Sequence, residues 1–146
     1  MTGDIEPGRA KKVVDITNIC FESESYDYIV CNHVLEHIPD DHKALNELYR
    51  VLKKRGTAFL SVPIKGEITD EDLSVVDPDE RTKRFGQFDH VRYYGIDFKT
   101  RIESAGFQVS VIMSKDIIKN ERLRELLGIN VTEGNAGNIL FVAKKI

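Results

Sequence analysis

The side chains best placed for chemistry in this sequence form the run His33-x-x-Glu36-His37. Two imidazoles and a carboxylate at this spacing match the inverted pattern of zinc proteases, in which the histidines hold the metal and the glutamate is a general base. Both histidines must then share one face well inside a helix. Here the run follows an apolar strand, and Pro39 comes two residues after His37, which leaves room for one helical turn. The pattern therefore favours histidines at a strand end over a zinc hydrolase, and we expect no metal site.

A further histidine, His90, lies in a segment where aromatic residues, one arginine and glycines are mixed. Imidazoles take up and release protons near neutral pH, so His33, His37 and His90 are the candidate general bases. The segment is interpreted either as a cover over a bound acceptor or as a loop held down by its aromatic residues. Its other members are Phe85, Phe88, Arg92, Tyr93 and Tyr94.

Short apolar, β-branched stretches bounded by polar residues predict the strands of the domain. They span residues 11–16, 26–31, 57–62, 107–113 and 138–143. Between them, apolar residues at helical spacing predict helices over 41–54, 97–105 and 116–127, the first with Asp40 as N-cap. Alternating strands and helices predict an α/β fold, doubly wound around a mostly parallel sheet covered on both faces.

The remaining stretch, residues 64–95, is long, rich in acids and interrupted by Pro78. It follows the carboxyl end of a predicted strand, where open α/β sheets bind their ligands. We therefore expect it to be an inserted loop or lid within one domain that spans residues 1–146.

Composition excludes several classes of protein. The 146 residues carry 24 acidic and 21 basic side chains, a formal charge of −3, which gives no electrostatic footprint for nucleic acid. No apolar run approaches the ~20 residues of a membrane helix, and the first ten residues lack the apolar stretch of a signal peptide. We expect a cytoplasmic protein with no membrane partner. Cys20 and Cys31 lack the spacing of a metal or redox pair and are predicted to be buried thiols.

Pieces of a longer pattern stand in order between Asp15 and Pro63. They are Asp15-Ile16-Thr17-Asn18-Ile19-Cys20-Phe21, Ser25-Tyr26-Asp27-Tyr28-Ile29, His33 to Ile38, and Arg50-Val51-Leu52-Lys53-Lys54-Arg55-Gly56 running to Val62-Pro63. With these motifs the chain resembles the class I S-adenosylmethionine-dependent methyltransferases of the broad type 11 group. The resemblance implies a Rossmann-like fold, S-adenosylmethionine as cofactor and in-line methyl transfer to a small-molecule acceptor.

The resemblance also implies roles for individual residues. Asp4 stands where the family's acid holds the ribose hydroxyls, and Asp15 with the backbone of Ile16 stands where the adenine edge is read. Asn32 and His33 would lie beside the methionine part and the reacting methyl group. The alternatives remain open that Asp15 is an ordinary turn residue and that Asp4 belongs to a frayed terminus.

The sequence departs from the family at its beginning. The family's first strand and glycine-rich loop precede the position of Asp4, where only three residues stand, and none of the ten glycines forms a Gly-x-Gly pair. We therefore expect a truncated methyltransferase domain, the C-terminal two-thirds of the family fold, with the missing part supplied by another chain or by a homo-oligomer that completes the sheet. The alternative is a non-catalytic relative that acts through self-association or a partner chain.

Overall fold

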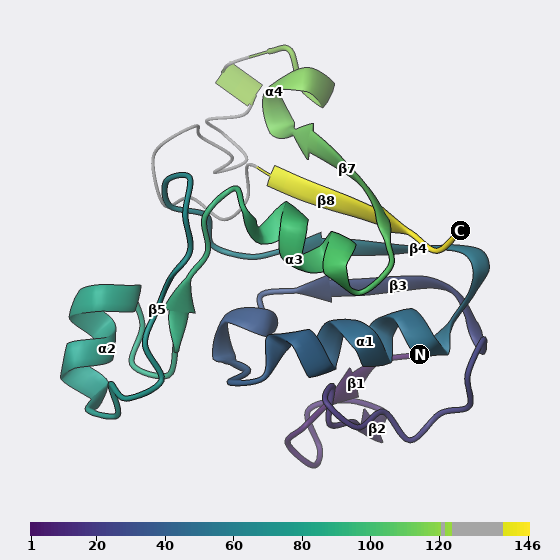
Figure 1. Cartoon of the computed structure of the whole chain (residues 1–146), viewed down its shortest axis with the longest axis horizontal. Helices are drawn as coiled ribbons and strands as arrows, with labels where there is room; N and C mark the ends of the chain where they lie inside the picture. Colours follow the sequence, from purple (N-terminus) through teal and green to yellow (C-terminus); the bar gives the residue numbers. More distant parts are fainter. Residues whose placement is uncertain (121, 124–138) are drawn as a thin grey trace.

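The structure, a computed structural model, describes residues 1–120, 122–123 and 139–146. Its main sheet has the spatial order β3 (Tyr26–Asn32), β4 (Leu52–Ser61), β8 (Ile139–Lys144), β7 (Gln108–Met113). β3 pairs in parallel with β4, whereas β8 is antiparallel to both β4 and β7. Three strands thus run one way and β8 runs the other (Figure 1). The predicted α/β class is confirmed. The sheet is mixed, because β8 lies between β4 and β7 and makes two of the three pairings antiparallel.

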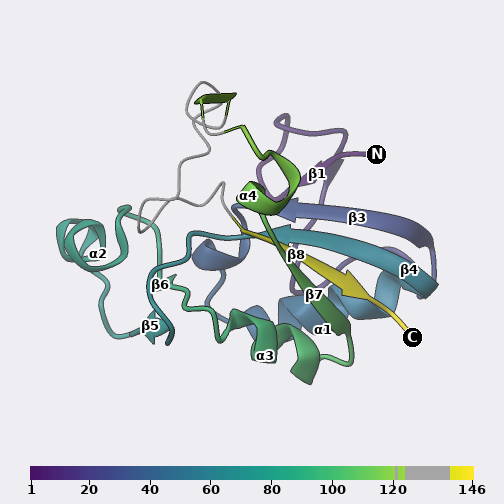
Figure 2. The ribbon, with the colours of Figure 1, turned by 90° about the horizontal axis from the view of Figure 1, so that it is seen from above.

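Two further strand pairs are short. β1 (Gly3–Asp4) pairs in parallel with β2 (Lys12–Val13), beside the β3 end of the main sheet (Figure 2). β5 (Asp70–Glu71) pairs antiparallel with β6 (Arg92–Tyr93). The predicted strand over residues 11–16 is therefore real but shorter than expected.

Helix α1 (Asp41–Val51) begins as predicted, because the side chain of Asp40 accepts a hydrogen bond from the Lys43 backbone N–H at 2.9 Å. It ends three residues earlier than predicted. Leu52 already has extended backbone angles and opens β4, and the pairing of β4 with β3 is irregular at this point. Lys53 and Lys54 therefore belong to a strand, in the irregular stretch between the pairs Tyr26–Leu52 and Tyr28–Thr57, and tertiary context overrides their helical propensity.

α1 and α3 (Phe98–Ser104) cover one face of the sheet (Figure 2). Their apolar stripes pack on alternate strand residues, and the rings of Phe98 and Phe141 meet edge to face with centroids 5.0 Å apart. Gly106 ends the α3 region with φ of +100°, as its place after the predicted helix required. The buried core includes Leu45, Leu48, Ala58, Leu60, Ile102, Phe141 and Ala143.

The face of β3 that points away from α1 is exposed, whereas the sequence predicted a sheet covered on both faces. Tyr28 and Val30 point away from α1 and are 71% and 67% exposed, with Tyr28 stacked on Phe59 of the neighbouring strand. Strand alternation explains this, because Ile29 and Cys31 take the inward positions. An apolar strand face is thus open in the part of the chain that the structure describes.

Residues 64–95 are more ordered than predicted, because they contain helix α2 (Pro78–Phe85). The side chain of Asp77 caps its first turn by accepting from the N–H groups of Asp79 and Glu80, and Gly86 ends it in the left-handed conformation. Asp77-Pro78 is a helix-start signal that the irregular composition of the segment concealed.

The predicted helix over residues 116–127 is represented by α4 (Ser114–Ile117). Residues 121 and 124–127 of that prediction lie outside the described residues, as does residue 138 at the start of the last predicted strand. Among the described helices, none combines the length and apolar character needed to cross a bilayer.

Candidate functional site

A cleft of about 820 Å³ separates the β1–β2 pair from the edge of β3 that has no strand partner among the described residues. Volumes of this size are typical of sites for small ligands. The cleft runs to the carboxyl end of β3, the end at which α/β sheets bind their ligands. Predicted site residues that line it are Asp4, Ile16, Asn32, His33 and His37.

The two predicted cofactor acids lie differently. Asp4 ends β1 and faces the cleft, with Oδ1 accepting the N–H of Glu6 at 2.9 Å. Asp15 is not part of the cleft lining. Its Oδ1 accepts from both the hydroxyl and the N–H of Thr17 at 2.8 Å, and these bonds, the hydroxyl above all, lower the pKa of Asp15. This geometry is that of a turn residue, which keeps the plain interpretation of Asp15 open.

Asn32 and His33 stand at the exit of β3 (residues 26–32). The backbone N–H of His33 donates to the carbonyl of Ser61, the last residue of the neighbouring parallel strand β4, at 3.0 Å. His33 then takes a φ of +53°, the left-handed conformation, and turns the chain out of the sheet. Its half-exposed ring comes within 3.3 Å of Glu36 through Nδ1 and Oε1. The strand exit therefore presents an amide and an imidazole to the cleft.

Of the three candidate bases, His33 and His37 line the cleft and His90 does not. The single turn predicted after His33 is a 3-10 helix, η1 (Leu35–His37). It puts His37 against His90, with ring centroids 4.7 Å apart and planes nearly perpendicular. His90 is only 7% exposed and, unlike His33 and His37, does not line the cleft.

Two acidic residues join this histidine pair: Glu36, which was considered from the sequence only within the zinc pattern, and Asp89, which was not considered. Glu36 is 1% exposed, and Asp89 lies with Oδ2 3.2 Å from Nδ1 of His37. Burial opposes ionisation of Asp89, but a hydrogen bond from Gln87 and the neighbouring His37 outweigh it and lower the pKa of Asp89. The spacing His33-x-x-Glu36-His37 was a signal for Glu36, whereas Asp89 could be found only from its contact across the fold.

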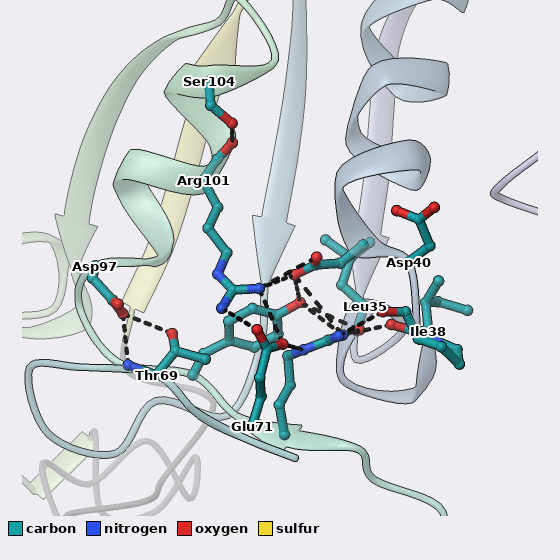
Figure 3. A network of polar contacts seen from close by, with 12 residues as sticks. Leu35, Ile38, Asp40, Thr69, Glu71, Asp97, Arg101 and Ser104 are labelled. Carbon is teal, nitrogen blue, oxygen red and sulfur yellow. Dashed lines mark hydrogen bonds and ion pairs between the residues drawn. The ribbon is translucent and has the colours of Figure 1, made fainter. Parts of the chain in front are cut away.

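A buried polar network fixes residues 64–95 on the domain (Figure 3). Arg92, 1% exposed, donates to the carbonyls of Leu35, Ile38 and Pro39 and through Nε to Glu71 at 2.8 Å. The backbone turn that carries Glu36 and His37 is thus held by a side chain 53 to 57 positions further on.

The network continues through two more buried groups. The hydroxyl of Tyr94 donates to Asp41 at 2.7 Å, and Arg101 of α3 bridges Asp41 and Glu71 (Figure 3). The hydrogen bond from Arg101, with further help from Arg92, lowers the pKa of Glu71 to about 2. The aromatic and charged residues of the segment therefore fasten it in place, as one of the two sequence interpretations held.

The two predicted buried thiols differ. Cys31, in β3, is 6% exposed, and burial raises its pKa to about 12. Cys20 is exposed, so that part of the prediction is wrong. It follows the buried Ile19 in an irregular segment.

The family model of the methyltransferase domain matches residues 6–60, which span β2, β3, α1 and β4. Mouse arsenite methyltransferase is 28% identical over 123 residues, which cover 83% of this chain and 31% of that protein. The chain spans about a third of the length of the curated relatives that it matches.

Solved structures show the same fold. A methyltransferase from Bacillus halodurans, described as putative, superposes with a TM-score of 0.53 and 19% identity, over 92% of this chain and 70% of that one. Phosphoethanolamine N-methyltransferase 2 of Haemonchus contortus, solved with S-adenosyl-L-methionine, gives 0.54 and 19%, over 90% and 36%. The chain has a Rossmann-like methyltransferase fold. Its predicted resemblance to the S-adenosylmethionine-dependent methyltransferases is confirmed.

Proposed function

We propose that the chain takes part in S-adenosylmethionine-dependent methyl transfer to a small-molecule acceptor. The observation that carries the proposal is the cleft beside β3, onto which Asp4, Ile16, Asn32 and His33 all open. The family match over residues 6–60 supports the cofactor class. When bound, the cofactor supplies a sulfonium-activated methyl group, so the protein contributes mainly alignment and a dry site.

The residues present fit such a cofactor at its ribose and methionine ends. Asp4 would accept the two ribose hydroxyls, because a carboxylate offers a fork of acceptors. The backbone of Ile16 would read the adenine edge, and Asn32 and His33 would hold the methionine part at the strand exit. His33 and His37 line the same cleft, and either would accept the proton of an acceptor that must lose one. His90, held outside the cleft lining, would act on the acceptor only through His37.

Residues 64–95 would form the acceptor side of the site. Because Arg92 and Tyr94 fasten this segment at 1% and 0% exposure, we propose a fixed cover over the acceptor instead of a hinged lid. The exposed ring of Phe88, on the stretch between α2 and β6, is available for acceptor contact.

The test is a calorimetric titration with S-adenosylhomocysteine. We expect micromolar binding by the native chain and at least about ten-fold weaker binding after Asp4→Ala, since hydrogen bonds to a charged group contribute about 1.5–3 kcal/mol. Asp15→Ala decides whether Asp15 touches the adenine or only shapes its turn. The matched control is Asp27→Ala, because Asp27 is an exposed acid paired with Lys53 outside the cleft. Equal affinity in the Asp4 and Asp27 variants would overturn the assignment.

A second candidate function is self-association through β3, with the chain acting without catalysis. In the described residues β3 pairs on one side only, and the apolar side chains of Tyr28 and Val30 are exposed beside that edge. Unpaired strand edges with apolar faces favour pairing with another copy. If this holds, light scattering shows a dimer that Val30→Lys converts to a monomer. A native chain that is monomeric at all concentrations would exclude it.

A further inference from the structure

We propose that Glu36, His37 and His90 bind a divalent transition-metal ion. Each offers one ligand atom, and the three atoms lie within 4.8 Å of one another. In a tetrahedral site with bonds of about 2.1 Å, two ligand atoms lie about 3.4 Å apart. The side chains would thus need to close by up to about 1.4 Å, a shift that rotation of the side chains can supply. From the sequence, His33 and His37 were considered as zinc ligands and a metal site was not expected. In the fold, the histidine that lies with Glu36 and His37 is His90, not His33.

The carboxylate of Glu36 is the first independent indication of a cation. The side chain is 1% exposed, and its Oε2 is buried with no hydrogen-bond partner among the described residues. Its other oxygen, Oε1, lies 3.3 Å from Nδ1 of His33. An ionised carboxylate buried without full compensation is expensive, because desolvation is not repaid by neighbours. A bound cation would supply the missing compensation.

Each of the two imidazoles has an oxygen acceptor near Nδ1. Nδ1 of His90 lies 2.9 Å from the carbonyl of Phe85, and Nδ1 of His37 lies 3.2 Å from the carboxylate of Asp89. An acceptor at Nδ1 fixes the proton there and leaves the Nε2 lone pair free. Histidines that ligate metals typically donate their other N–H to a backbone carbonyl or a carboxylate, and this pair has one of each.

The backbone holds the two halves of the ligand set together. The N–H of Val91 donates to the carbonyl of Glu36 at 3.0 Å, next to His90 in the chain. Arg92 then donates to the carbonyl of Leu35 at 3.0 Å. The residues on either side of the ligands are therefore bonded directly across the site. Such positioning reduces the ordering that metal binding would otherwise require.

Two imidazoles and one carboxylate suit Zn²⁺ and neighbouring divalent ions such as Co²⁺, in preference to Mg²⁺ or Ca²⁺, which favour oxygen-only sites. Three protein ligands leave at least one coordination position for water or for an acceptor oxygen or sulfur. Of the three ligands, His37 also lines the cleft, which places the metal site beside it. Metal binding itself does not depend on the proposed methyl transfer.

The experiment is a titration of the chelator-treated chain with Zn²⁺ followed by calorimetry, with Co²⁺ absorption as a second readout. We expect one ion per chain, a four- or five-coordinate cobalt spectrum and a higher Tm with metal than without. Glu36→Gln keeps the shape of the side chain, and His90→Ala removes a ligand; each should weaken binding at least about ten-fold.

The matched control is His42→Ala, because His42 is the chain's fourth histidine and lies exposed on α1, outside the cluster. It should bind Zn²⁺ like the native chain. Circular dichroism of the metal-free variants separates lost binding from lost folding, and Glu36→Gln is the variant expected to fold as the native chain does. The proposal is overturned by substoichiometric binding, or by Glu36→Gln and His42→Ala binding Zn²⁺ equally. No S-adenosyl compound is present, so a failure here is distinct from a failure of the proposed function.

Discussion

The two walls of the molecule around the exit of β3 are built in opposite ways. On the acceptor side, Arg92 and Asp41 are 1% and 2% exposed and almost every buried polar group is paired. On the other side, around the β1–β2 pair, Ile5 and Val30 are 63% and 67% exposed and the cleft separates the strands. One wall is fixed by its own side chains, whereas the other presents surface that a ligand or another chain can cover.

This difference shows which part of the site is held in a single arrangement by the protein itself. A buried network of charged groups rarely adds net stability over an apolar core, but it fixes a single arrangement of the residues that it joins. Here it joins the turn that carries Glu36 and His37 to the segment that carries His90. The cleft wall needs no such network, because a bound cofactor would supply the missing contacts.

The strongest way to break the fixed wall is Arg92→Ala. It removes donors to three carbonyls and to Glu71, and leaves Asp41 with one cation fewer. Loss of one partner from a buried charge network costs about 3–5 kcal/mol, so urea unfolding should show a loss of this size. The control is Arg9→Ala, whose pair with Glu6 is exposed and should change the free energy of unfolding by less than about 0.5 kcal/mol. Similar values for the two variants would mean that Arg92 does not hold the wall.

The next largest effect concerns Glu71 and pH. Its folded pKa of about 2 lies below its ordinary value of 4.5, so its stabilisation is present above about pH 4.5 and is lost as pH falls toward 2. Because the side chain is 36% exposed, screening reduces the contribution to about 1–2 kcal/mol. Glu71→Gln should therefore unfold more easily at pH 7 and show a flatter acid profile. Urea unfolding from pH 7 to pH 2 measures this, with Glu103→Gln, an exposed i,i+4 pair, as the comparison. Parallel pH profiles for native chain and Glu71→Gln would contradict the assignment.

The smallest effect is expected on the open wall. Val30→Ser changes a side chain that is already in solvent, so the free energy of unfolding of the monomer should change by less than about 0.5 kcal/mol. Leu60→Ala, on the inward face of the neighbouring strand, should cost about 2–5 kcal/mol. Urea unfolding at low protein concentration compares the two. A loss above about 1 kcal/mol for Val30→Ser would show that this face is covered in solution.

The fold was largely predictable because its signals are local. The apolar stripe of α1 and its N-cap Asp40 lie within a dozen consecutive residues, and the apolar runs of β3 and β4 are equally short. The end of α1 was not predictable from propensity, since Lys53 and Lys54 are good helix formers and the strand β4 begins at Leu52 through pairing with Tyr26 of β3, far away in the chain. α2 was missed even though Asp77-Pro78 marks its start, because the acids around it outweighed that short signal.

The candidate site was predictable only in part, because its geometry depends on contacts between distant segments. Asp4, Asn32 and His33 were found by resemblance and do line one cleft, although their roles remain predictions. The meeting of Glu36 with His90 joins residues 54 positions apart, and no local pattern encodes it. Composition placed Arg92 in an aromatic segment but gave no hint that it would be buried against three carbonyls.

The central claim is that the open wall beside β3 is where the cofactor binds, and hydrogen exchange with and without saturating S-adenosylhomocysteine tests it most directly. The account predicts slower exchange in the backbone around Asp4, Ile16 and residues 30–34, with little change in α2, whose hydrogen bonds do not depend on the ligand. Protection confined to residues 64–95, or an exchange pattern that the ligand leaves unchanged, would contradict it.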